Sequence, residues 1–383
     1  MTYATGRTFY DADSHIMDLP DFLRRYADPD VRDAMPNKAS ATAGQIGHND
    51  TLTDAGHPEA YRAELLALGD ELISGPKNYK ALGAFSADER TQALDLLGFD
   101  KQLVFVSFAA GTAFNPKLDE KVRYGASRAA NRGMAEFCGA DDRLMGVAVI
   151  PLDNPALAIG ELEQALKQNL QAVWVPHRHC GGRSPGHNDF DPFWARLEEA
   201  AVPFVLHVGG AALQIEEPWT NTGRPLPTDW LGGGENVRGK DMVRLHQDAE
   251  KFIGCLLLDG VLERFPKLRG GVIELGADWV PGMLKRLDHI AKTWGRTEPE
   301  IAALKRKPSE QITQQMAFTP FVFEDVGDLI RSSNPDLYLF SSDYPHAEGG
   351  RNPLGRFRSS LEGFDEPVLA KFYSENFERV FTI

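Results

Sequence analysis

The sequence predicts an α/β fold in the form of a distorted (β/α)8 barrel of the TIM type, with loop and helical insertions after its first and fifth strands. Short apolar or β-branched runs alternate along the chain with longer segments whose apolar residues recur at helical spacing. Several short runs also end in Asp, Glu or His, and barrel enzymes assemble their sites from such strand ends. An open, doubly wound parallel sheet is the main alternative.

Eight runs are expected to form the strands, because they are rich in residues that favour a pleated sheet and have turn residues around them. They cover residues 8–13, 101–108, 144–150, 172–176, 204–208, 271–275, 315–318 and 337–341. Helices are expected between them, among others at residues 58–68, 154–167, 190–201, 251–265, 280–290 and 366–377. Eight repeats of a strand and a helix are what a closed barrel requires.

Two stretches interrupt this alternation, and both follow an expected strand. Residues 28–90 carry Pro, Gly and Asn around a short helical pattern, and residues 209–246 contain runs of glycine. Loops of this length in a compact domain usually form lids or binding surfaces. We therefore expect one domain, residues 1–383, with an insertion at about 28–90 and a lid-like loop at about 209–246.

The composition excludes several classes of partner. The formal net charge is −14, whereas a surface for nucleic acid or an anionic membrane needs basic stripes. No apolar run approaches the length of a transmembrane helix, and the N-terminus lacks a charged-then-apolar signal pattern. The three cysteines, Cys138, Cys180 and Cys255, are widely spaced and odd in number, which fits a reducing compartment. We expect a cytoplasmic protein with a small-molecule substrate and no nucleic-acid or membrane partner.

The most informative motif is the run 11–15, Asp-Ala-Asp-Ser-His, in the first expected strand. Side chains two residues apart in a strand point to the same face, so Asp13 and His15 converge on one point. Asp11 lies on that face too and is interpreted as structural support. A carboxylate beside an imidazole suits Zn, Mn or Fe. The alternative is a strand end with a capping aspartate, because short motifs of this kind also arise by chance.

Four other expected strands end in residues that can bind a metal or act in catalysis. One ends in His207, a second in Glu274, and a third in Asp343 with His346 three residues later. A fourth is followed by the run 177–179, His-Arg-His. Each of these residues has a structural explanation when taken alone, such as a turn begun by Asp343. Together with the first strand they predict a metal site at the carboxyl ends of the strands.

On these residues the chain resembles the amidohydrolase superfamily. The similarity rests on residues 11–15, on Phe-Pro-Lys-Leu at 265–268 leading into Glu274, and on Ser-Ser-Asp-Tyr-Pro-His at 341–346. Residues 372–381 are similar to the closing helix of one branch, amidohydrolase-2. That branch contains enzymes like aminocarboxymuconate-semialdehyde decarboxylase and resorcylate decarboxylase. The resemblance spans nearly the whole chain.

The resemblance implies a TIM barrel with one divalent metal ion, most commonly zinc or manganese. The implied ligands are Asp13, His15, His207 and Asp343, with Asp13 at a position where the family has His or Glu. No lysine ends the expected strand at 172–176, so the carbamylated lysine that bridges two metals elsewhere in the superfamily is absent. A mononuclear site and a homodimer are therefore implied.

The chain departs from the family at the sixth strand, where Glu274 stands in the place of a histidine that assists water activation or proton transfer. A glutamate can act as a general base or acid if burial raises its pKa, and it can also bind the metal directly. It cannot supply the neutral-donor and cationic states of an imidazole. The added carboxylate favours a hard ion such as Mn or Mg, with Zn as the alternative.

Three functions remain open from the sequence. In the first, which we favour slightly, a metal-activated water hydrolyses a small ester, lactone or amide, with Asp343 taking the proton and Glu274 assisting. In the second, the protein decarboxylates an aromatic or unsaturated acid without an oxidant. Asp343 then relays a proton to carbon, while His177 or Arg178 steadies the leaving carboxylate. In the third, the barrel is a degenerate enzyme that only binds a ligand.

Two further residues are candidates for contacting the substrate. His346 is close to Asp343 in sequence and can orient a bound molecule. Trp279 is one of several aromatic residues that are consistent with an apolar pocket. The identity of the substrate is not readable from the sequence.

Overall fold

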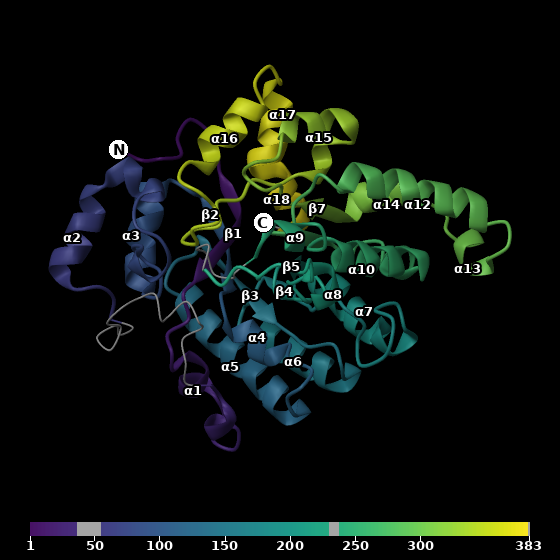
Figure 1. Ribbon diagram of the computed structural model, residues 1–383, viewed down its shortest axis with the longest axis horizontal. Coiled ribbons are helices and arrows are strands. Elements are labelled where there is room, and N and C mark those ends of the chain that lie inside the picture. Colours follow the sequence, from purple (N-terminus) through teal and green to yellow (C-terminus); the bar gives the residue numbers. More distant parts are fainter. Residues whose placement is uncertain (37–54, 230–236, 382–383) are drawn as a thin grey trace.

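The computed structural model describes residues 1–36, 55–229 and 237–381 (Figure 1). Its centre is a sheet of seven parallel strands, and each strand pairs with the next along the chain. They are β1 (Tyr10–Ile16), β2 (Lys101–Val106), β3 (Leu144–Val149), β4 (Ala172–Trp174), β5 (Phe204–His207), β6 (Gly270–Ile273) and β7 (Met316–Phe318). This confirms the predicted distorted barrel and excludes the doubly wound sheet, whose strand order reverses.

The expected eighth strand, residues 337–341, is not a regular strand. The segment still connects the two edges of the sheet, because the N–H of Leu339 bonds to β7 and the carbonyl of Phe340 accepts from β1, both at 3.0 Å. The N–H groups of Phe340 and Ser342 are directed elsewhere, to the carbonyl of Phe372 and to a buried carboxylate on β1. The prediction is therefore corrected: the segment closes the barrel through single bridges, because its donors are used outside the ladder.

The helices that surround the strands begin with α1 (Phe22–Tyr26), α2 (Glu59–Ala67), α3 (Ala87–Leu97), α4 (Ala109–Ala113), α5 (Glu120–Cys138), α6 (Pro155–Lys167), α7 (Asp191–Ala200), α8 (Glu217–Thr220) and α9 (Gly239–Met242). They continue with α10 (Gln247–Leu258), α11 (Val261–Arg264), α12 (Val280–Trp294), α13 (Pro299–Ala302), α14 (Pro308–Gln315), α15 (Val326–Ser332), α16 (Pro353–Ser360), α17 (Glu366–Ala370) and α18 (Asn376–Phe381). Short 3-10 turns are η1 (Arg32–Ala34), η4 (Gly69–Ser74), η5 (Asn78–Lys80), η6 (Asn188–Phe190) and η7 (Pro335–Leu337), and η8 (Lys371–Glu375) is a π-helix.

The sequence predicted most of the long helices but not their breaks. The helix α6 matches its prediction because Asn154 caps it and a proline follows at the first helical position. The helix expected at 251–265 is divided into α10 and α11, because Gly260 takes a left-handed conformation with φ of 74°. The closing helix is interrupted by η8, and that turn presents the Phe372 carbonyl to the barrel. The long helix α5 was not anticipated.

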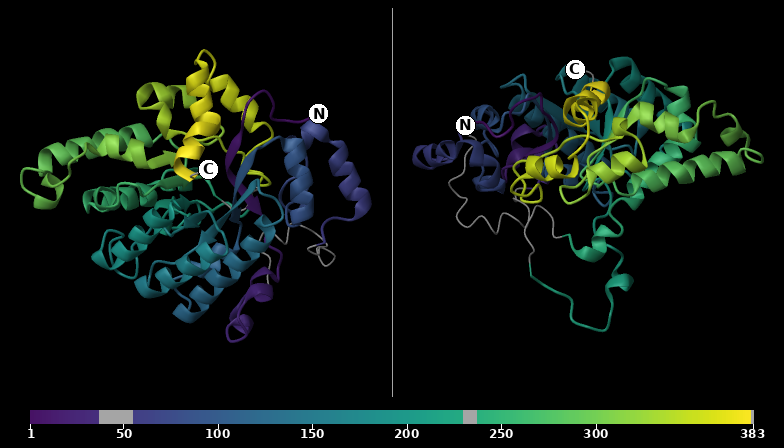
Figure 2. Two further views of the ribbon diagram at one scale, coloured as in Figure 1. Left: turned by 180° about the vertical axis from the view of Figure 1, so that it is seen from behind. Right: turned by 90° about the horizontal axis from the view of Figure 1, so that it is seen from above.

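The two stretches that interrupt the alternation lie outside the ring of strands. Helices α2 and α3 lie beside β1 at one side of the molecule (Figure 1). The segment from Gly209 to Asp229, which includes α8, projects from the body (Figure 2). It is attached at its base by Lys240, whose ammonium group donates to the carbonyl of Trp219 at 2.7 Å. Residues 37–54 and 230–236 of the expected insertion and loop lie outside the described residues. No described helix is long and apolar enough to cross a membrane.

Candidate metal centre

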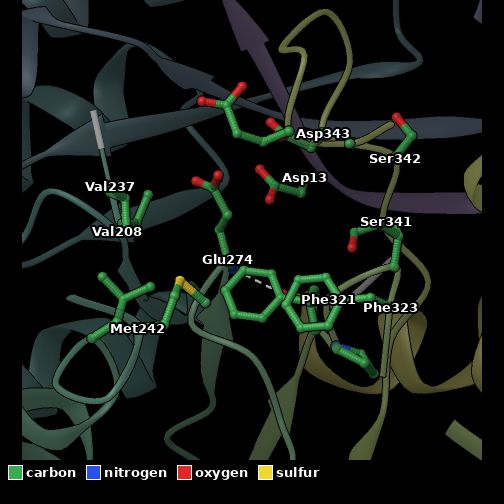
Figure 3. A pocket seen from close by; sticks show the side chains of 16 residues that line it. Asp13, Val208, Val237, Met242, Glu274, Phe321, Phe323, Ser341, Ser342 and Asp343 are labelled. Carbon is green, nitrogen blue, oxygen red and sulfur yellow. Dashed lines mark hydrogen bonds between the residues drawn. The ribbon is translucent and has the colours of Figure 1, made fainter. Parts of the chain in front are cut away.

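A cavity of about 320 Å³ opens at the carboxyl ends of the strands (Figure 3). Its lining comes from the ends of β1, β5, β6 and β7 and from the segment that closes the barrel. The lining residues are Asp13, Val208, Val237, Met242, Leu245, Glu274, Thr319, Pro320, Phe321, Val322, Phe323, Ser341, Ser342, Asp343, Glu348 and Gly349. Carboxylates lie at one side of this space, and the stacked rings of Phe321 and Phe323 lie at another.

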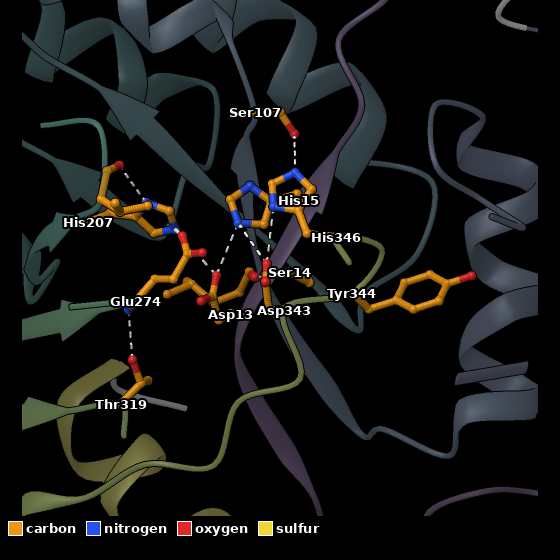
Figure 4. Close-up of polar contacts among 12 residues, drawn as sticks. Asp13, Ser14, His15, Ser107, His207, Glu274, Thr319, Asp343, Tyr344 and His346 are labelled. Carbon is orange, nitrogen blue, oxygen red and sulfur yellow. Dashed lines mark hydrogen bonds and ion pairs between the residues drawn. The ribbon is translucent and has the colours of Figure 1, made fainter. Parts of the chain in front are cut away.

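The first strand delivers two side chains to the bottom of this cavity, as the sequence predicted. Asp13 and His15 alternate along β1 and are both buried. Their side chains meet, with Nε2 of His15 3.2 Å from Oδ1 of Asp13 (Figure 4). Neither ring nitrogen of His15 has a hydrogen-bond partner in the described chain. Burial and the neighbouring His346 lower the pKa of His15 to about 3, so the imidazole is neutral, which is the form that binds metals.

His207 ends β5 and faces the same two residues. Its Nε2 lies 3.4 Å from Oδ1 of Asp13, and its ring centroid lies 5.0 Å from that of His15. The other ring nitrogen, Nδ1, is 2.9 Å from the carbonyl oxygen of Val208, so it carries the proton and donates. The lone pair of Nε2 is therefore directed to the centre of the cluster, as in histidines that bind metals.

Glu274 follows β6 and completes a group of four potential ligands. Its backbone has a φ of 54°, an unusual left-handed conformation for a side chain of this kind, and its N–H donates to the hydroxyl of Thr319 at 2.8 Å. Its Oε2 lies 3.5 Å from Nε2 of His207. One potential ligand atom from each of Asp13, His15, His207 and Glu274 lies within 4.8 Å of the others.

Asp343 stands beside this group and takes part in a second one. Its N–H donates to the carbonyl of Asp13 at 2.8 Å, and its φ of 53° turns the chain at this point. Its Oδ1 lies 3.5 Å from Nε2 of His15 and 3.1 Å from Nδ1 of His346. His15, Asp343 and His346 form the second group of potential ligands. The structure thus adds Glu274 to the three predicted ligands Asp13, His15 and His207, and pairs Asp343 with His346.

The protonation of His346 follows from its hydrogen bonds. The hydroxyl of Ser107 donates to the carbonyl of Ile16 at 2.6 Å, so it accepts from Nε2 of His346 at 2.8 Å. Nε2 therefore carries a proton, and Nδ1 is left facing Asp343. Burial disfavours charge on this ring, but the Asp343 carboxylate prevails and raises the pKa of His346 to about 9. The ring also stacks on His15 with centroids 3.9 Å apart.

These residues fit one divalent metal ion. Two neutral imidazoles and several carboxylates form a mixed nitrogen and oxygen donor set, which suits Mn or Zn. Both nitrogens of His15 and both carboxylate oxygens of Asp343 are buried and have no hydrogen-bond partner within the described residues. Buried polar atoms of this kind are costly unless something binds them, and a cation would satisfy them.

Three residues proposed from the sequence lie outside the cluster. His177 is buried with its Nδ1 close to Gly210, lines no part of the cavity and belongs to neither ligand group. Burial lowers its pKa to about 3. The guanidinium of Arg178 is paired with Asp153 at 2.9 Å. The indole N–H of Trp279 donates to backbone carbonyls that follow β6. We correct these assignments, because the side chains are engaged in packing or pairing away from the cavity.

The structure also shows lining residues that the sequence argument missed as site residues. Phe321 and Phe323 follow β7, and their rings stack with centroids 5.1 Å apart. Glu348 follows Asp343 by five residues and lines the same cavity. Their position after expected strands was the available signal. It was not decisive because most loop residues share it.

Comparisons with known proteins agree with this geometry. The sequence model of the amidohydrolase family matches residues 10–383. A decarboxylase of Emericella nidulans is 25% identical over 279 residues, which cover 72% of this chain and 78% of the relative. A gamma-resorcylate decarboxylase of Polaromonas sp. is 26% identical over 276 residues, which cover 67% of this chain and 76% of the relative.

Solved structures share the fold. An amidohydrolase from Mycobacterium avium subsp. paratuberculosis superimposes with a TM-score of 0.74 at 22% identity, covering 99% of this chain and 100% of the other. A dihydroxybenzoic acid decarboxylase from Polaromonas sp., solved with manganese and 2-nitroresorcinol, gives a TM-score of 0.60 at 18% identity, covering 98% and 97%. A 5-carboxyvanillate decarboxylase from Novosphingobium aromaticivorans, solved with manganese and a nitrobenzoic acid, gives 0.62 at 18% identity, covering 100% and 99%.

Proposed function

Because the chain belongs to the amidohydrolase family, we propose that it is a metal-dependent enzyme that decarboxylates an aromatic acid without an oxidant. Two decarboxylase relatives that match about two thirds or more of the chain support this reaction over the hydrolysis that the sequence favours. The observation that carries the proposal is the position of Asp343. Its carboxylate lies between His15 and His346 and lines an otherwise largely apolar cavity.

We propose that Asp13, His15, His207 and Glu274 hold the metal ion, and that Asp343 is left to carry a proton. These four residues place their ligand atoms closest together. When bound, the ion would supply Lewis-acid chemistry, attracting the anionic oxygens of the substrate. This assignment replaces Asp343 of the predicted ligand set by Glu274.

The cavity walls would hold the aromatic ring and exclude water from it. Phe321 and Phe323 stack at one wall, and Met242, Leu245 and Val208 provide an aliphatic wall. An aromatic ring gains binding energy from such walls by burying apolar surface. Removing water from a carboxylate also favours its loss as neutral carbon dioxide.

Asp343 and His346 would supply the proton that replaces the carboxyl group. When the bond to the carboxylate breaks, its electron pair stays on the ring carbon, and that carbon takes the proton held at Asp343. The sum is an aryl carboxylate plus a proton giving an arene and carbon dioxide. His346, with Nδ1 at 3.1 Å from the Asp343 carboxylate, can then return a proton to it. This pair would provide the imidazole that the sixth strand lacks.

The test is a panel of hydroxybenzoates with protein loaded with Mn²⁺ in deuterated water. We expect carbon dioxide to be released and one deuterium to appear at the ring carbon that carried the carboxylate. Asp343→Asn should abolish the release, while Glu300→Gln on the exposed helix α13 should not change it. Absence of carbon dioxide, together with oxygen-18 from water in the product of an ester or lactone, would identify a hydrolase instead.

A further inference from the structure

The ionisable side chains that line the cavity are all acidic within the part of the chain that the structure describes. They are Asp13, Glu274, Asp343 and Glu348. The first three belong to the two groups of potential metal ligands, but Glu348 belongs to neither. It lies on the loop after the barrel-closing segment and is exposed to solvent. The cavity therefore contains a carboxylate that the proposed metal centre does not use.

Cations near the cavity are committed to other groups. Arg90 is buried and donates to two backbone carbonyls, one of them that of His15. Arg244 donates to two carbonyls of the loop after β5, both at 2.9 Å. Lys77 interacts electrostatically with Asp343 and Glu348, but its ammonium nitrogen is buried and does not line the cavity. A second anionic group on a bound ring would thus meet carboxylates without a cation in the described lining to pair with it.

We propose that this cavity selects aromatic acids with a single carboxylate and rejects dicarboxylates, and that Glu348 is a residue that sets this preference. The inference rests on the proposed function and names its substrate class. One carboxylate can be neutralised at the metal centre. Hydroxyl or amino groups elsewhere on the ring can donate to Glu348 or to Ser341, which also lines the cavity.

The physical basis is repulsion in a partly enclosed, largely apolar space. A second carboxylate loses water there and gains no opposite charge in return, which disfavours binding. Each lining carboxylate a few ångströms away adds to the penalty, and water reduces the share of an exposed group such as Glu348. Glu348 should therefore modulate the preference, with the buried acidic groups providing the remainder.

The experiment measures binding and not turnover, by calorimetry on the full chain loaded with Mn²⁺. The two probes are 2,6-dihydroxybenzoate and 2-hydroxyisophthalate, which differ by one hydroxyl exchanged for a carboxylate. We expect the monocarboxylate to bind more than about tenfold tighter, since several unit charges oppose the second carboxylate. Glu348→Gln should reduce this ratio about fivefold, and Glu348→Lys should reduce it further.

Glu300→Gln is the matched control, because it removes one negative charge from the exposed helix α13, which does not line the cavity. It should leave the ratio unchanged, and thermal unfolding should show that all variants are folded. Equal binding of the two acids, failure of the monocarboxylate to bind, or a ratio that Glu348→Gln does not move would overturn the inference. If the ratio behaves as expected and no carbon dioxide is released, the decarboxylase function fails while the charge selection stands.

Discussion

Two aspartates on β1, Asp11 and Asp13, have the same chemistry and the same burial but opposite surroundings. Asp11 accepts from the N–H and the hydroxyl of Ser342 at 2.7 and 2.6 Å, and from the amide of Gln102 at 2.8 Å. Asp13 faces His15 and His207 at 3.2 and 3.4 Å. One carboxylate is satisfied by neutral donors, and the other is directed to imidazoles.

The difference separates a structural carboxylate from a ligand. Burial raises the pKa of Asp11 to about 7, against the lowering effect of its hydrogen bonds to Ser342 and Gln102. Burial acts on Asp13 in the same direction, but the two imidazoles outweigh it and hold its pKa below the ordinary range. Asp11 joins β1 to the segment that closes the barrel. Asp13 is free of such a structural duty and can bind a cation.

The comparison is tested most strongly by removing the charge of Asp13. Asp13→Asn should lower the affinity for Mn²⁺ by more than about a hundredfold, because a neutral amide is a poor replacement for a central carboxylate ligand. Metal analysis after dialysis and titration with Mn²⁺ monitored by electron paramagnetic resonance would measure this loss. A variant that keeps one equivalent of tightly bound metal would show that Asp13 is not a ligand.

The same change at Asp11 should act on the fold and not on the metal. Asp11→Asn places an amide where three donors converge, so we expect a loss of about 2 kcal/mol in the free energy of unfolding. Urea unfolding in the presence of a chelator measures it without the contribution of bound metal. Mn²⁺ affinity of the folded variant should change less than that of Asp13→Asn. The reverse order of effects would contradict the division between the two aspartates.

How much of this was readable from the sequence follows from the range of the interactions. Alternation along a strand is local, so the convergence of Asp13 and His15 and the supporting role of Asp11 were predictable. The strand ends at His207 and Glu274 were predictable from the barrel pattern. The partners of Asp11 were not, because Gln102 and Ser342 are 91 and 331 residues away.

The errors have the same origin. Arg178 was assigned to the substrate because it follows a strand, but only the fold brings Asp153 to its guanidinium. The eighth strand was expected from its apolar run, and its irregularity depends on the distant carbonyl of Phe372. Whether Glu274 binds the metal also depended on backbone geometry, since its left-handed conformation and its bond to Thr319 aim the side chain.

Glu274 provides the smallest and most discriminating test, because it should behave like Asp13 and not like Asp11. Glu274→Gln should weaken Mn²⁺ binding about tenfold, less than Asp13→Asn, since Glu274 is partly exposed and water can take its place as a ligand. Its free energy of unfolding in chelator should stay within about 0.5 kcal/mol of the wild type, as for other side chains outside a buried network. Glu274→Asp retains the charge on a shorter side chain and should recover part of the affinity. Unchanged affinity in Glu274→Gln would instead return the fourth ligand position to Asp343 and leave Glu274 as a general base.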